Sequence, residues 1–387
     1  MDRRTFVKVG CIASASLMME GLDPTKMRAD QAPPVAPSIE LHGLAEYKTS
    51  PLGMPGLFPG RVIEVRNPKA IIRNRVSQPI VREMLAYAMR ELTGESSVQA
   101  AWAKFVEQND VVGIKINPSG APACCSSPEL IREIIGAVQS VGVPTRNIVV
   151  YDRYSYEIDI GSYQPLLPAG IRIVGIQEAF TSSTGYEPTI YCSANFFGEW
   201  ETRSYMASIV AHELTKIINV PTMKDHSAAG VTGALKNLAY GTFNNVARTH
   251  RAPYSFTNPL VGLMCTVEPL RSKAVLHIMD GMRQVWHGGP LTQVQEFIDQ
   301  PGILLAATDP VAMDSIELEA IEAKRQARGA PSLWQHDPNS ITSSNEVYFH
   351  DSSKNLFFRQ PGHVAAAAKL GLGITDLKKI DHRLHLA

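Results

Sequence analysis

Short apolar runs alternate along this chain with longer segments in which apolar residues recur at helical spacing. The short runs are rich in Val and Ile and are typical of strands buried within a sheet. They lie at residues 61–65, 110–118, 147–153, 171–176, 215–220, 273–280 and 303–308. The helical segments lie at residues 78–92, 97–108, 128–141, 207–213, 229–240, 260–267, 311–327 and 361–370. This alternation predicts an α/β fold with a mostly parallel sheet and helices on both faces.

Capping residues mark several of the predicted helix boundaries. Ser127 precedes Pro128, and Asp309 precedes Pro310, which is the usual arrangement at the start of a helix. Gly241 follows the segment 229–240 and predicts its end. Within residues 110–153 the order is strand, helix, strand, so these two strands are expected to be parallel neighbours.

Two segments depart from the alternation. Residues 177–206 are rich in Thr, Ser, Tyr and Phe, and they predict an irregular insertion that contains short strands. Residues 330–358 are polar and predict a loop. We therefore interpret residues 38–387 as one α/β domain, with a subdivision near 177–206 as the alternative.

The first 37 residues have a different character. Arg3 and Arg4 are followed by Phe6, Lys8 and the short apolar stretch 9–19. This arrangement resembles a twin-arginine export signal, which predicts a periplasmic or otherwise exported protein and the twin-arginine translocase as a transient partner. The alternative is a basic start to a first helix. The apolar stretch is well short of the ~20 residues that a spanning helix needs, so no membrane span is predicted.

Composition and charge narrow the classes of function. The chain has 387 residues, of which 44% are hydrophobic and 19% charged, so it can form a full core without disulfides. Its formal net charge is zero, and charges of both signs are mixed. Nothing in this balance favours nucleic acid or an anionic membrane as a partner. The sequence also lacks a phosphate-binding P-loop, a dinucleotide-binding glycine motif and a His-Glu-x-x-His metal motif.

The cysteines form no recognisable ligand pattern. There are five, and none belongs to a C-x-x-C pair, so neither a zinc knuckle nor an iron–sulfur motif is present. Cys124 and Cys125 are adjacent. They are either two small residues of a loop or a pair with a redox or metal-binding role.

Reactive side chains are concentrated in residues 222–241. This stretch follows the predicted strand 215–220 and is rich in Gly, Ser and Thr, as ligand-binding loops between a strand and a helix often are. Lys224 and Lys236 are candidate anion ligands or bases, and Asn237 adjoins Lys236. His226 is a candidate general acid or base, with a structural histidine as the alternative.

Further polar residues fall where predicted strands end. Lys115 interrupts an apolar run and must reach a polar partner, and Asn117 follows it. Asp152 and Asp280 end two other predicted strands. Ligands of open α/β sheets lie at the carboxyl ends of strands, so these groups are candidates for one site, with caps and turns as the alternative.

The sequence leaves open whether the protein binds a metal ion. His250 is a candidate catalytic partner of His226, and Arg248 is a candidate substrate ligand; a basic surface segment is the alternative for both. Two histidines and an aspartate suit a transition metal, and strand-end aspartates suit Mg²⁺ or Ca²⁺. No close-spaced ligand pattern identifies either kind of site.

Several of these segments resemble the DUF362 proteins, a bacterial and archaeal family without a generally established activity. The matching segments lie, in the order of the family, at residues 112–117, 217–226, 233–241, 278–282 and 307–314. The resemblance implies an α/β fold over roughly residues 60–375. Many relatives carry a ferredoxin-like cysteine cluster, which this chain lacks. A more distant resemblance is to the N-terminal domain of nickel-pincer lactate racemases, although their Asp-Asp-His-Thr-Arg-Pro motif is absent.

These observations predict an exported enzyme that acts on a small anionic molecule by acid–base chemistry, as an isomerase, lyase or hydrolase. Lys115, Lys224 and Lys236 would hold the anion, and His226 would move a proton with His250. The alternatives are an exported ligand- or metal-binding protein without turnover and a cofactor-dependent redox protein.

Overall fold

The computed structural model describes residues 37–178, 185–195, 201–250, 256–330, 332–334 and 361–387. The predicted export signal and most of the predicted loop 330–358 lie outside these ranges. Among the described residues, none of the helices combines the length and hydropathy needed to cross a lipid bilayer.

A large sheet with its strands in the order β16-β2-β15-β13-β10-β5-β6-β7 runs through the molecule. These strands are β2 (Arg61–Arg66), β5 (Val112–Lys115), β6 (Ile148–Tyr154), β7 (Arg172–Gln177), β10 (Lys216–Asn219), β13 (Ala274–Val285), β15 (Ile303–Ala307) and β16 (Asp381–Leu386). Neighbours from β13 to β7 are parallel, as are β16 and β2, whereas β15 is antiparallel to both of its neighbours. The predicted mostly parallel sheet is therefore confirmed.

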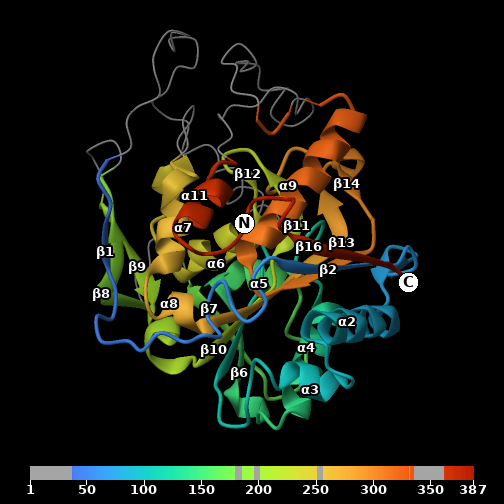
Figure 1. The fold of residues 1–387 in the computed structure, drawn as a ribbon, viewed down its shortest axis with the longest axis horizontal. Coiled ribbons are helices and arrows are strands. Elements are labelled where there is room, and N and C mark those ends of the chain that lie inside the picture. Colours follow the sequence, from blue (N-terminus) through green and yellow to red (C-terminus); the bar gives the residue numbers. More distant parts are fainter. Residues whose placement is uncertain (1–36, 179–184, 196–200, 251–255, 331, 335–360) are drawn as a thin grey trace, which may run out of the picture.

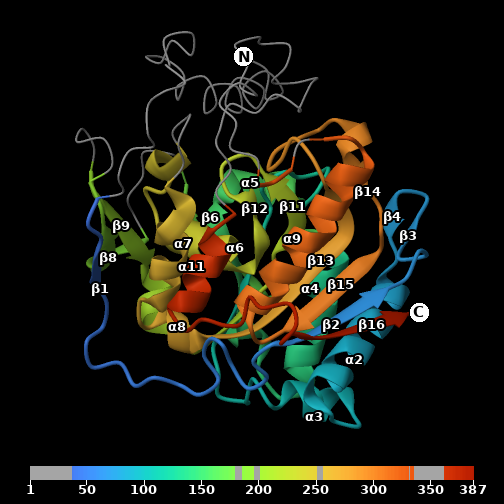
Figure 2. The same cartoon turned by 45° about the horizontal axis from the view of Figure 1, so that its top comes forward.

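Helices cover both faces of this sheet (Figures 1 and 2). One group comprises α2 (Gln78–Thr93), α3 (Val98–Trp102) and α4 (Pro128–Ser140), and the other comprises α6 (Gly233–Thr242), α7 (Thr257–Thr266), α9 (Pro310–Ala327) and α11 (His363–Lys369). Alternate residues of β15 enter two separate cores: Leu304 packs with the first group, and Leu305 with the second. Burial on both faces is why the strands have continuous apolar sequences.

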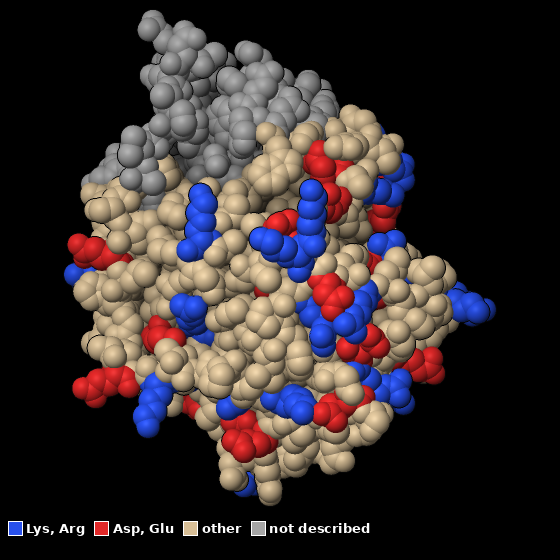
Figure 3. All heavy atoms as spheres, in the orientation of Figure 1, with Lys and Arg blue, Asp and Glu red and all other residues tan. Residues whose placement is uncertain are grey.

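The insertion at 177–206 contributes to a second sheet, as its composition predicted. β8 (Tyr186–Ser193) pairs antiparallel with β9 (Arg203–Ala207) and with β1 (Glu40–His42). This three-stranded sheet lies at the edge of the molecule beyond α7 (Figures 1 and 2). On the face shown in Figure 3, acidic and basic side chains are interspersed, in keeping with the zero net charge.

The structure corrects several predicted elements. Residues expected to form a loop after β10 instead form β11 (Thr222–His226), which pairs with β13 and with β12 (Gly230–Val231). Because Gly230 is held in this pairing, α6 begins at Gly233 and not at residue 229. The segment predicted as a helix at 97–108 is helical only over α3, and that at 207–213 is a single π-helical turn, η3 (Ile209–Glu213). Strand β16 was not predicted.

Candidate active site

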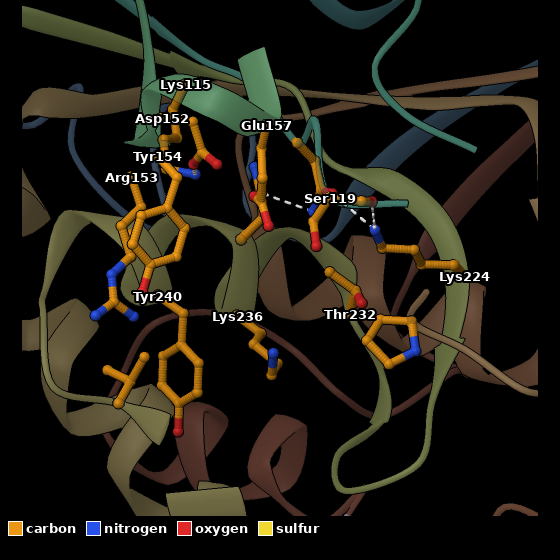
Figure 4. A pocket seen from close by; sticks show the side chains of 15 residues that line it. Lys115, Ser119, Asp152, Arg153, Tyr154, Glu157, Lys224, Thr232, Lys236 and Tyr240 are labelled. Atoms are coloured by element: carbon orange, nitrogen blue, oxygen red, sulfur yellow. Dashed lines mark hydrogen bonds and ion pairs between the residues drawn. The ribbon is translucent and has the colours of Figure 1, made fainter. Parts of the chain in front are cut away.

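Polar side chains converge on a small cavity at the carboxyl ends of β5 and β6 (Figure 4). Its volume is about 150 Å³. The residues that line it are Lys115, Asn117, Ser119, Asp152, Arg153, Tyr154, Glu157, Lys224, Thr232, Lys236, Asn237, Tyr240, Gly241, Val246 and Pro290. Six of the predicted site residues are in this group: Lys115, Asn117 and Asp152 come from the ends of β5 and β6, Lys224 from β11, and Lys236 and Asn237 from α6.

Lys115 and Asp152 form a buried ion pair on one wall of the cavity. The Lys115 ammonium donates to Asp152 Oδ1 and to the carbonyl of Ile116, the latter at 3.0 Å. Lys115 is the last residue of β5, so its side chain emerges from the apolar sheet where polar partners are available. Gly241 packs closely against this pair, since a Cβ atom added there would lie 3.0 Å from Asp152 Oδ1.

Lys224 is held on the opposite wall by a chain of amide groups. Its ammonium donates to Asn117 Oδ1 at 2.7 Å and to the carbonyl of Ser119. Asn117 in turn donates to Asn237 Oδ1 at 2.9 Å, and Asn237 donates to Asn219 Oδ1 at 2.8 Å. This chain fixes Lys224 to β10 and α6. Burial lowers the pKa of Lys224.

Lys236 differs from the other two lysines because no described residue forms a hydrogen bond with its ammonium. The Nζ atom lies 4.6 Å from the centre of the Tyr240 ring, a cation–π distance, and faces the cavity (Figure 4). Burial, aided by the charges of Lys224 and Lys115, lowers the pKa of Lys236 to about 7. Its amine can therefore gain and lose a proton near neutral pH.

Glu157 is a pocket residue that the sequence analysis missed. It lies in α5 (Ser155–Ile160), directly after β6, and its carboxyl faces the cavity (Figure 4). Withdrawal from water, reinforced by the charge of Asp152, raises the pKa of Glu157 to about 7. Its position in the first turn of the helix that follows β6 was the available signal, because that helix begins at the sheet edge where the strand ends.

Comparison with family models matches residues 112–319 to DUF362, a domain of unknown function. That range is more than half of the chain and contains every pocket lysine. The chain belongs to the DUF362 family. A search of curated proteins found no match. The family description supplies no activity, so the function of this DUF362 protein has to be argued from its site.

The two predicted catalytic histidines of the DUF362 protein lie together, but they do not line the cavity. Their ring centres are 5.2 Å apart, and the His250 ring packs edge-on against Tyr240. His226 Nδ1 accepts hydrogen bonds from the backbone N–H groups of Ala228 and Ala229, which places its proton on Nε2. Burial lowers the pKa of His226 well below its usual range and that of His250 to about 3. Both rings are therefore neutral.

Two further predicted site residues lie away from the cavity. Arg248 is buried, and its guanidinium donates to the carbonyls of Asn245, Ala194 and Thr202, which ties the segment after α6 to the small sheet. Asp280 lies within β13 and not at its end, because the strand continues to Val285. Its carboxylate accepts from both the backbone N–H and the hydroxyl of Ser127 at the start of α4.

The vicinal cysteines lie near the pocket but outside its lining. All four described cysteines are free thiols, and Cys124 is buried. Burial raises the pKa of Cys124 to about 12 and that of Cys125 to about 11, so both are protonated at neutral pH. Within the described part of the chain, no three or more His, Cys, Asp or Glu side chains are grouped so that they could hold a metal ion.

Proposed function

We propose that this DUF362 protein is an enzyme that binds a small anion in the lysine pocket and transfers a proton to or from it. The observation that carries the proposal is the position of Lys236 and Glu157 at one cavity, each with a pKa of about 7. General acid–base catalysis is most efficient when the catalytic pKa lies near the working pH. We assign the proton-transfer role predicted for His226 to this pair, whereas His250 packs against Tyr240 and His226 packs against His250.

The charges and size of the cavity support a small anionic substrate. Three lysines face it, and Asp152 pairs with only one of them. Its volume of about 150 Å³ is well below the ~300–1,000 Å³ of pockets that take drug-sized ligands. A carboxylate of a few carbon atoms suits this space and these charges.

The chemistry favoured by this pair is isomerisation, elimination or hydrolysis. A neutral Lys236 amine accepts a proton from the substrate, and a protonated Glu157 donates one. In the reverse reaction the two groups exchange these roles, as microscopic reversibility requires of a proton-transfer pair.

Export by the twin-arginine route is part of this proposal. The supporting feature is the Arg3-Arg4 pair before the apolar stretch 9–19. Cell fractionation of the full chain is expected to find it outside the cytoplasm, and the double substitution Arg3→Lys, Arg4→Lys is expected to retain it inside. Equal distribution of both forms would contradict the export assignment.

Proton exchange tests the enzymatic proposal directly. The protein is incubated in D₂O with a panel of small carboxylates, and deuterium incorporation is followed by NMR. We expect exchange on at least one acid, a loss of roughly 100-fold with Lys236→Met or Glu157→Gln, and no change with Lys378→Met or Glu319→Gln, which alter exposed residues. Binding of acids without exchange would favour the alternative of a ligand-binding protein without turnover.

A further inference from the structure

We infer that Lys236 is a nucleophile that forms a Schiff base with the carbonyl carbon of a small 2-oxo acid. This inference rests on the proposed function, names its substrate class and makes Lys236 the nucleophile, so that Glu157 carries the proton transfer once the imine has formed. Its basis is the contrast among the three pocket lysines. Lys115 and Lys224 are each held by two hydrogen bonds, whereas no described residue forms a hydrogen bond with Lys236.

The lone pair of Lys236 is available for attack at neutral pH. An ordinary lysine with a pKa of ~10.4 has only about one amine in 2,500 neutral at pH 7. With a pKa of about 7, about half of the Lys236 amines are neutral. Desolvation beside other cationic groups is an established means of activating a lysine for imine formation.

The surroundings of Lys236 match the two functional groups of a 2-oxo acid. An ammonium has three N–H donors, and Lys115 and Lys224 each use two of them within the protein. Each therefore retains one N–H for a carboxylate. The buried hydroxyl of Thr232 lines the same cavity and has no hydrogen-bond partner among the described residues. It can donate to the oxygen of the carbonyl under attack.

The reaction balances without an oxidant or reductant. The Lys236 nitrogen attacks the carbonyl carbon, the C–N bond forms, and one nitrogen proton passes to the carbonyl oxygen to give a carbinolamine. Glu157 then protonates that hydroxyl, which leaves as water while the C=N bond forms. The resulting iminium withdraws electrons from the adjacent carbon and acidifies its protons, so the Glu157 carboxylate can remove one of them.

Reductive trapping tests the inference. The full chain is incubated with pyruvate and cyanoborohydride, and the adduct is located by peptide mass spectrometry. We expect one reduced pyruvate per chain, bound at Lys236. The yield of adduct is expected to fall roughly tenfold or more in Lys236→Met, because the activated amine is removed. Lys378→Met is expected to trap as the wild type does. Adducts spread over surface lysines, or an adduct that persists in Lys236→Met, would overturn the inference.

Propionate, which has a carboxylate but no ketone, separates this inference from the proposed function. If both acids raise the melting temperature and Lys224→Gln weakens the rise, yet pyruvate gives no adduct, the Schiff base is wrong and anion binding stands. If neither acid raises the melting temperature and no adduct forms, the proposed function fails as well. Circular dichroism of Lys236→Met and of the milder Lys236→Arg confirms that a loss of adduct does not reflect unfolding.

Discussion

Three lysines with the same side chain have different chemistry in this pocket because their partners differ. Lys115 is neutralised by Asp152, Lys224 is fixed by amide and carbonyl oxygens, and Lys236 faces an aromatic ring. Burial lowers the pKa of Lys236, and the two neighbouring ammonium groups lower it further. A lysine's function here is therefore set by what surrounds its Nζ atom.

The pH dependence of trapping at Lys236 provides a test at this scale. Because the neutral amine reacts, trapping is expected to rise between pH 6 and pH 8 with a midpoint near the pKa of about 7. Lys224→Gln removes one repelling charge, so the midpoint is expected to move to higher pH. Trapping rates measured across this range in both proteins check the shift. A midpoint unchanged by the substitution would mean that burial alone sets the pKa.

Gly241 offers a second prediction at the scale of one residue. Its φ of 101° is rare for other residues, and an added Cβ would lie 3.3 Å from Lys115 Nζ. Gly241→Ala is expected to cost about 1–3 kcal/mol of the free energy of unfolding and to weaken anion binding. The matched control is Gly136→Ala at an exposed position of α4, where an added Cβ would have no neighbouring atom within 4 Å, and it is expected to stabilise the protein by up to about 1 kcal/mol. Urea denaturation measures both changes.

At the scale of elements, the pocket depends on how β13 positions its neighbours. This strand pairs with β10, β11 and β15, and its Asp280 holds the start of α4. Ser127 was predicted to cap α4 with its own side chain, but its hydroxyl donates to Asp280 instead. Capping of this helix is therefore a tertiary contact between distant segments.

Removing this contact is expected to destabilise the fold. In the native protein, the backbone N–H of Ser127 donates to Asp280 Oδ2 at 2.7 Å, and that of Met282 donates to Asp280 Oδ1 at 3.0 Å. Asp280→Ala leaves both N–H groups without these acceptors. An unsatisfied buried donor costs about 1–3 kcal/mol. The urea concentration at the midpoint of unfolding is therefore expected to fall, while the slope of the free energy of unfolding against urea concentration stays unchanged. Asp159→Ala, at an exposed position of α5, serves as the control and is expected to change stability by less than about 0.5 kcal/mol.

At the scale of the whole molecule, the fold buries several histidines in neutral form. Burial lowers the pKa of His277 and of His250 to about 3 and lowers that of His226 well below its usual range. In the unfolded chain each would titrate near ~6.5. The unfolded state therefore binds more protons than the folded state in mildly acidic solution, and this difference favours unfolding.

Stability is consequently expected to fall in acid. The contribution of these histidines is complete above pH ~6.5 and is lost as the pH falls toward their folded-state pKa values, which are about 3 for His250 and His277. The loss is up to about 1.4 kcal/mol per pH unit for each histidine. His250→Phe keeps an aromatic ring against Tyr240 and is expected to make the free energy of unfolding depend less on pH. His42→Phe on β1, an exposed position where the ring stacks on Tyr191, is expected to leave the pH dependence of stability unchanged. Urea denaturation of the wild type and both variants at pH 7, 6 and 5 measures how steeply the free energy of unfolding depends on pH.

Local sequence determined much of this protein. Apolar runs such as 147–153 specify buried strands, because side chains on both faces of the sheet must be apolar, and caps such as Asp309 specify where helices begin. Lys115 could be selected as a site residue because a charge within an apolar run needs a polar destination. Lys224 and Lys236 could be selected because they lie in a Gly-, Ser- and Thr-rich stretch that follows a predicted strand.

Tertiary structure alone decided the composition of the pocket. Whether a polar residue such as Thr222 lies in a loop or a strand depends on pairing with β13, which is distant in sequence. Glu157 enters the cavity and His226 stays outside it because helix and strand packing orients their side chains, which neighbouring residues do not encode. The pKa of Lys236 likewise depends on burial and on charges contributed by other elements. Sequence therefore supplied the reactive groups, and long-range packing selected which of them face the cavity.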